Sequence, residues 1–176
     1  MSGTRAVTVL LEDHLTTLNR AVGLIRRRNF PVHSLAVGPT DVPGVSRLTI
    51  MMQSDDATAE RAAQHLQKII GVRDATAISP GEAVAREIAL VKLRPPAERY
   101  AELLDVVQLY HATVVDECAD VVIVELTGSE AFVLSCIRAL ERFDIIEVAR
   151  SGAVALESGA ADLRIGTQPQ LEAGAT

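Results

Sequence analysis

The sequence contains few cysteines and few aromatic residues. It has two cysteines, no tryptophan and 3% aromatic residues. Cys118 and Cys136 lie far apart and outside any CxxC pattern, which argues against a disulfide framework and favours a reducing compartment. No apolar run approaches the roughly 18 residues that cross a bilayer, and no apolar signal region precedes the first predicted strand. We therefore expect a cytoplasmic protein with no membrane partner.

Positive charge is also scarce. The net charge is −6, which argues against non-specific nucleic-acid binding as the main role. The basic run Arg26–Arg28 lies at a predicted helix end, where a solvated face that complements the helix dipole is the simpler interpretation. Apolar residues make up 48%, so the chain can bury a core, and with so few aromatic rings that core must consist of Val, Leu, Ile and Ala.

The sequence contains no recognisable catalytic or metal-binding pattern. Its four histidines show no metal-ligand spacing among themselves or with the cysteines: His14, His33, His65 and His111. There is no G-x-S-x-G, no phosphate-cradling glycine run and no H-E-x-x-H. Asp13 and His14 could form an acid–base pair, but neighbours in a turn usually face solvent. We predict no catalytic residue, no metal ligand and no cofactor bound by this chain.

The chain does contain one order of elements twice. Periodicity predicts strand, helix, strand, strand, helix, strand over residues 5–78, and the same order over residues 86–149. Turn residues cluster between the two copies at Ser79-Pro80-Gly81. Each copy is a split βαβ unit, so the expected class is α+β with two tandem ferredoxin-like (βαββαβ) domains. The predicted organisation is a first domain at 1–78, a linker at 79–85, a second domain at 86–156 and a flexible tail at 157–176.

Two helices can cover only one face of each predicted sheet. The strand at 5–11 has apolar side chains on both faces, which predicts partial cover on both for that strand. The remaining sheet face and the edge strands are expected to be open, and an open apolar face favours pairing of like domains into a homodimer.

The stretch around which the chain is organised is the first strand, the turn Glu12–His14 and the helix that follows. The first backbone N–H groups of that helix face the end of the strand, which is a candidate site for an anion or a zwitterion such as an amino acid. Asp13, Thr16 or Thr17 could cap the helix.

Several segments resemble one family. LLEDHLTTLNRAVGLI followed by SLAVGPTDVPGVSRLTI resembles the amino-terminal ACT domain of the acetohydroxyacid (acetolactate) synthase small subunit, which makes the first predicted domain an ACT domain and the second ACT-like. VAREIALVKL at 84–93 and IIEVARSGAVAL at 145–156 resemble that family's second domain. The resemblance covers residues 5–156. Two segments make the resemblance specific, because a generic ACT domain is not expected to carry them. They are S-x-x-V-x-P-T-D…S-R-x-T-I and E-V-A-R-S-G.

The resemblance implies a non-catalytic regulatory subunit. In such proteins the small subunit dimerises through its ACT domains, binds the large catalytic subunit and raises its activity. A branched-chain amino acid, usually valine, binds between the paired ACT domains and feeds back on the enzyme. Thiamine diphosphate, magnesium and FAD are expected on the partner subunit. A stand-alone amino-acid sensor without a synthase partner is the alternative, and an enzyme in its own right is a third possibility that no visible site supports.

This chain departs from the family pattern at the effector turn, which resembles E-N-x-x-G-x-L. Asp13 replaces an amide by a carboxylate that only accepts hydrogen bonds, and Thr16 adds a Cβ where the family has glycine. Pro31, which has no N–H, aligns with a further expected Asn. The candidate effector residues form one set: Asp13, His14, Leu15, Thr16, Thr17, Pro31 and Val32.

Each hydrogen bond lost to a buried polar group weakens binding by about 1–3 kcal/mol, which is roughly 5- to 150-fold. The sequence therefore predicts weak or absent valine binding, with the assembly role retained. Whether Asp13 simply caps the helix in an empty site or serves a changed ligand stays open at this point.

Overall fold

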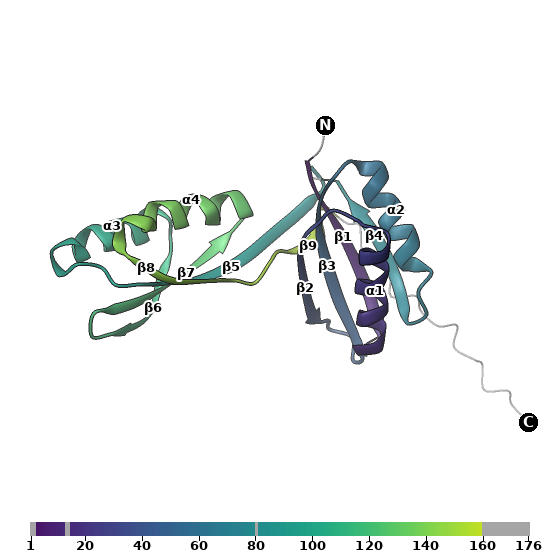
Figure 1. Cartoon of the computed structure of the whole chain (residues 1–176), viewed down its shortest axis with the longest axis horizontal. Coiled ribbons are helices and arrows are strands. Elements are labelled where there is room, and N and C mark those ends of the chain that lie inside the picture. Colours follow the sequence, from purple (N-terminus) through teal and green to yellow (C-terminus); the bar gives the residue numbers. More distant parts are fainter. Residues whose placement is uncertain (1–2, 13–14, 80, 160–176) are drawn as a thin grey trace, which may run out of the picture. The chain divides into compact units, whose positions relative to one another are not determined.

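The computed structural model describes residues 3–12, 15–79 and 81–159. These residues form two compact units (Figure 1). One unit holds the described residues up to Val84 together with those from Ala155 on, and the other is Ala85–Val154. The chain therefore passes between the units twice.

The first unit is built on an antiparallel sheet of strand order β2-β3-β1-β4. Both helices, α1 and α2, lie on the same side of this sheet (Figure 1). The elements are β1 (Gly3–Glu12), α1 (Leu15–Arg27), β2 (Val32–Pro39), β3 (Val45–Ser54), α2 (Asp56–Gln67) and β4 (Val72–Ile78). This is the strand order of a ferredoxin-like unit, as the sequence predicts.

Alternation along the central strands decides which side chains meet the helices. Val7 pairs with Ile50 and Val9 with Leu48 in the β1–β3 register. All four are at most 1% exposed, and they pack with one face of each helix. The helix residues in this core are small or branched: Ala21, Ile25, Ala59, Ala62, Ala63 and Leu66. Small alanines let α2 approach the sheet closely in a core without aromatic rings.

The second unit repeats the arrangement, with strand order β6-β7-β5-β8 and helices α3 and α4 on one side of the sheet. Its elements are β5 (Ala83–Leu93), a 3-10 turn (Ala97–Arg99), α3 (Tyr100–Leu109), β6 (Thr113–Cys118), β7 (Val121–Gly128), α4 (Glu130–Leu140), a second 3-10 turn (Glu141–Phe143) and β8 (Ile145–Arg150). Phe143 is fully buried in its core, where the guanidinium carbons of Arg99 and Arg142 lie 5.1 and 4.9 Å from the ring centre.

A further strand, β9 (Val154–Glu157), pairs with β5. β5 begins at Ala83, inside the segment 79–85 that the sequence analysis treats as a linker. The Ser158 N–H donates to the Glu82 carbonyl oxygen at 2.6 Å. Because the returning chain supplies a hydrogen-bonding partner, these residues form a strand in spite of the nearby turn signal. The predicted flexible tail at 157–176 lies mainly outside the described residues, and Glu157 is the last residue of β9.

The expectation of an open outer sheet face is wrong for the first unit. Ala6, Thr8 and Leu10 point away from the helices and are each at most 2% exposed, in line with the cover predicted for β1. On β3, however, Thr49 and Met51 lie on the same outer face, and they are only 1% and 9% exposed. The expectation allowed for cover from the two helices only, whereas this unit also takes in the chain from Ala155 on. In the second unit the face is open: Ile88 is 40% and Leu90 is 42% exposed.

Candidate functional site

The described part of the predicted effector turn lies against the connection between α2 and β4. The Glu12 N–H, at the end of β1, donates to the Gly71 carbonyl oxygen at 2.8 Å. Asp13 and His14 of the candidate set fall outside the described residues. α1 begins at Leu15, so the three candidates that follow occupy its first turn.

Of these three residues only Thr17 is buried. Leu15 is 81% exposed and Thr16 is also exposed, whereas Thr17 is 3% exposed. Thr17 packs on Gly71, whose φ of +95° lies in the region that favours glycine over residues with a Cβ. A Cβ placed on Gly71 would lie 2.5 Å from the Thr17 Oγ1 atom. Thr17 is therefore a packing residue of the turn, and a ligand here would meet Leu15 and Thr16.

Pro31 and Val32 lie at the other end of α1. Val32 pairs with Met52, which also pairs with Arg5 near the start of β1, whereas Glu12 at the turn pairs with Val45. A helix of 13 residues spans about 20 Å. One chain therefore does not bring the two parts of the candidate set together, and no single small ligand reaches both within one copy.

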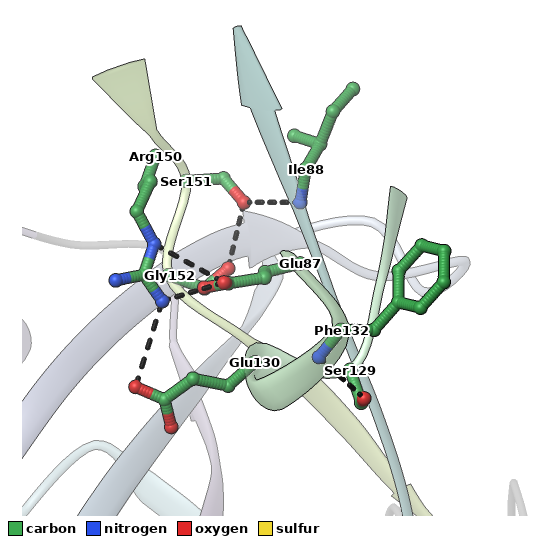
Figure 2. A network of polar contacts seen from close by, with 8 residues as sticks. All are labelled: Glu87, Ile88, Ser129, Glu130, Phe132, Arg150, Ser151 and Gly152. Carbon is green, nitrogen blue, oxygen red and sulfur yellow. Dashed lines mark hydrogen bonds and ion pairs between the residues drawn. The ribbon is translucent and has the colours of Figure 1, made fainter. Parts of the chain in front are cut away.

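A second polar cluster lies in the other unit, where β5, β8 and the start of α4 meet (Figure 2). Glu87 is 5% exposed, and its Oε1 atom accepts hydrogen bonds from the Arg150 Nη2 atom at 2.6 Å and the Nε atom at 3.2 Å. The same Nη2 atom lies 3.5 Å from the Glu130 Oε1 atom. Arg150 thus links a buried carboxylate to a carboxylate in the first turn of α4.

The residues after Arg150 are held to the same strand. The Ser151 N–H donates to the Ile88 carbonyl oxygen at 3.0 Å, and the Ile88 N–H donates to the Ser151 Oγ atom at 3.1 Å. The Ser151 hydroxyl donates in turn to the Gly152 carbonyl oxygen at 2.7 Å. Figure 2 shows the two bonds of the Ser151 hydroxyl beside the Glu87–Arg150 pair. We call these residues, Glu87, Glu130, Arg150 and Ser151, the arginine cluster.

The sequence analysis singled out the E-V-A-R-S-G segment but missed Glu87. A signal was present, because Glu87 shares its strand face with Ala89 and Val91, both buried core residues. A carboxylate in register with apolar core positions requires a charged partner. In the structure that partner is Arg150, 63 positions along the chain, a separation that strand periodicity alone does not predict.

The two cysteines of the chain are free thiols in different surroundings. Burial raises the pKa of the Cys136 thiol to about 11, so this sulfur is protonated at neutral pH and is a poor nucleophile. Cys118 is exposed and unpaired. No group of three or more His, Cys, Asp and Glu residues in these ranges could hold a metal ion, and no helix among them is long and apolar enough to span a membrane.

Comparisons with known proteins match both units. A family model described as "AHAS small subunit-like ACT domain" matches residues 7–74, and one described as "Small subunit of acetolactate synthase" matches residues 86–159. The chain is 35% identical over 156 residues to the "Acetolactate synthase small subunit" of Mycobacterium bovis, covering 89% of this chain and 93% of that protein.

Two further relatives come from distant organisms. The "Probable acetolactate synthase small subunit" of Archaeoglobus fulgidus is 35% identical over 153 residues, covering 87% of this chain and 96% of that protein. The crystal structure of the acetolactate synthase small subunit from Thermotoga maritima superposes with a TM-score of 0.83 at 30% identity, covering 90% of this chain and 99% of that one.

Proposed function

The chain belongs to the acetolactate synthase small-subunit family, and from this premise we propose that it is a non-catalytic subunit that binds the large catalytic subunit and raises its activity. The observation that carries the proposal is the extent of the match, because the family models fall on both units, at 7–74 and 86–159. A free-standing ACT domain would have no counterpart to the second unit or to the arginine cluster within it.

The chemistry in this proposal belongs to the partner. The described residues offer no paired general acid and base in a cavity and no activated nucleophile, since the buried Cys136 thiol has its pKa raised to about 11. In line with the family resemblance, we assign thiamine diphosphate, magnesium and FAD to the large subunit, where pyruvate would condense with pyruvate or 2-ketobutyrate. The role of this chain is to change the activity of that subunit by contact.

We propose that the chain forms a homodimer, and the geometry of the candidate effector residues supports this proposal. Thr16 and Pro31 are separated by the length of α1, so an amino acid that touches both parts of the set needs a second copy of the chain. β2 is an edge strand of its sheet, with Leu35 39% and Val37 49% exposed. An edge with exposed apolar side chains is a favourable place for two copies to meet.

Valine feedback is proposed to be weakened in this protein. Thr16 presents a side chain where glycine would leave the backbone open to a ligand, and Pro31 offers neither a donor N–H nor a polar side chain. Thr17 is committed to packing on Gly71. The loss of even one hydrogen bond to the ligand reduces affinity by roughly 5- to 150-fold.

The decisive experiment mixes the purified chain with its cognate large subunit and measures acetolactate formation with and without valine, leucine and isoleucine. Activation with little response to valine is the expected result. Tight valine inhibition would contradict the effector proposal but leave the subunit role intact. Failure to bind or activate the synthase, with amino-acid binding retained by the isolated chain, would favour a stand-alone sensor.

The dimer is tested separately by light scattering coupled to size-exclusion chromatography. Leu35→Asp places two like charges close together if the β2 edges meet, and it should shift the chain toward monomer. Leu104→Asp, at a 42% exposed position on α3 in the second unit, is the matched control and should leave the dimer unchanged. A wild-type chain that is monomeric at all concentrations would overturn the proposal.

A further inference from the structure

The first unit contains a basic hollow between the end of α1 and the side of α2. Its volume is about 280 Å³. It is lined by seven residues from the two elements: Arg28, Asn29, Phe30 and Pro31 after α1, and Thr58, Arg61 and His65 on α2. Pro31 also belongs to the candidate effector set, whereas the other lining residues play no part in the function proposed above.

Positive charge converges on this hollow from two directions. Arg28 follows α1, and Arg61 lies one helical turn from both Thr58 and His65 on α2. None of the lining residues is acidic. No carboxylate of the described ranges lies within ion-pair distance of Arg28 or Arg61. Two guanidinium groups that share a hollow repel one another, so the arrangement is most favourable when an anion lies between them.

Two contacts among the lining residues restrict side chains on the α2 side of the hollow. The Arg61 Nη2 atom donates to the Thr58 Oγ1 atom at 2.9 Å, which fixes one edge of the guanidinium and leaves other N–H groups free to bind a ligand. The His65 imidazole lies against the Phe30 ring, with the ring centres 6.3 Å apart. This contact gives the hollow a partly apolar wall that limits competition from water.

One acidic residue is close to the hollow but is otherwise engaged. Asp55 caps α2 by accepting the Thr58 N–H at 2.8 Å. Hydrogen bonds from Thr58, with a smaller contribution from the charge of Arg61, hold the pKa of Asp55 below its ordinary value. Asp55 is not a lining residue, and its carboxylate is directed to the backbone at the start of α2.

From this geometry we propose that the hollow binds a phosphate group, either as free phosphate or carried on a small molecule, through Arg28, Arg61 and His65. A planar carboxylate satisfies one guanidinium fork, whereas a tetrahedral dianion offers oxygen atoms to donors on several sides at once. The proposal does not depend on the synthase partner, because every group in it belongs to one unit of this chain.

Isothermal titration of the full-length chain at fixed ionic strength tests the proposal. The probes are inorganic phosphate, glycerol phosphate and acetate. Saturable binding of a phosphate probe is expected, with affinity reduced about tenfold or more in Arg28→Ala and in Arg61→Ala. Arg73→Ala removes an exposed arginine of β4 that does not line the hollow, and it should change affinity less than about twofold. Binding of glycerol phosphate would indicate a carried phosphate group, and binding of inorganic phosphate alone would indicate the free ion.

Three results would overturn the proposal. They are no saturable heat with either phosphate probe, acetate binding as tight as phosphate, and equal weakening in Arg73→Ala and Arg61→Ala, which would reveal a general effect of charge. Circular dichroism of each variant checks that it is folded. His65→Gln gives a second route to the same conclusion, because it removes the ionisable ring while keeping a donor and should weaken binding less than either arginine variant.

Discussion

Removing Arg150 should destabilise the second unit far more than removing Glu87. The Glu87 side chain is 3% exposed and that of Arg150 is 29% exposed. Arg150→Met leaves a buried carboxylate without the two hydrogen bonds it accepts at 2.6 and 3.2 Å. Breaking a buried pair in this way costs about 3–5 kcal/mol, because the remaining charge is uncompensated.

The reverse substitution leaves a different residue behind. Glu87→Leu removes the buried charge and retains Arg150, which still reaches solvent and the Glu130 carboxylate at 3.5 Å. We expect it to cost about 1 kcal/mol or less. The double variant Glu87→Leu with Arg150→Met should resemble Glu87→Leu alone, because neither leaves an uncompensated buried charge.

Tyrosine fluorescence during urea unfolding reports this unit selectively. The chain has two tyrosines and no tryptophan, and both tyrosines, Tyr100 and Tyr110, lie in the second unit. At a urea m-value of about 1–1.5 kcal/mol/M, a cost of about 3–5 kcal/mol means that Arg150→Met should lower the midpoint of this transition by about 2–5 M. Arg138→Met, an exposed position on α4, is the control and should leave it within about 0.5 M.

The reasoning would be refuted if Arg150→Met and Glu87→Leu destabilised the unit equally. The same would follow if the double variant were as unstable as Arg150→Met. Either outcome would mean that the arginine acts through packing rather than by compensating the charge of Glu87.

Three smaller predictions concern single buried groups. Gly71→Ala should lower the free energy of unfolding by about 2 kcal/mol or more, since φ is +95° and the new Cβ would displace Thr17; thermal unfolding measures it. Thr8→Val should raise that free energy by about 1 kcal/mol, because the buried Thr8 hydroxyl has no hydrogen-bond partner among the described residues. An unchanged midpoint of urea unfolding would contradict this. Burial raises the pKa of Cys136 from 9.0 to about 11, so only the unfolded thiol ionises between these values. This group should lower stability by at most about 1.4 kcal/mol per pH unit there, and Cys136→Ala should reduce the slope of stability against pH.

Local pattern was enough to predict the helices and strands of both units. Val7 and Val9 on β1 and Ala89 and Val91 on β5 alternate with the period of a strand, and all four are at most 1% exposed. The ferredoxin-like order could be predicted because the same element sequence occurs twice. These features depend on residues close together in the chain, and the structure confirms them.

Features that depend on distant residues were not predicted. β9 follows the glycine of the R-S-G segment at the end of the predicted second domain, and it forms a strand because β5 is available as a partner. The Glu87–Arg150 pair and the burial of Thr49 on the outer face of β3 also depend on residues far away in the chain. The candidate effector set was chosen by alignment with a family pattern, which carries no distance, and the structure separates Thr16 from Pro31 by the length of α1.

The double crossing between the units affects the order in which the protein can be completed during synthesis. A ribosome delivers β9 only after nearly every residue of the second unit has been made, so the first unit receives this returning segment later than the rest of its described residues. A fragment that ends near residue 84 would therefore lack a segment of its own unit. Truncations meant to isolate the first unit should restore residues 155–159 through a short artificial connection.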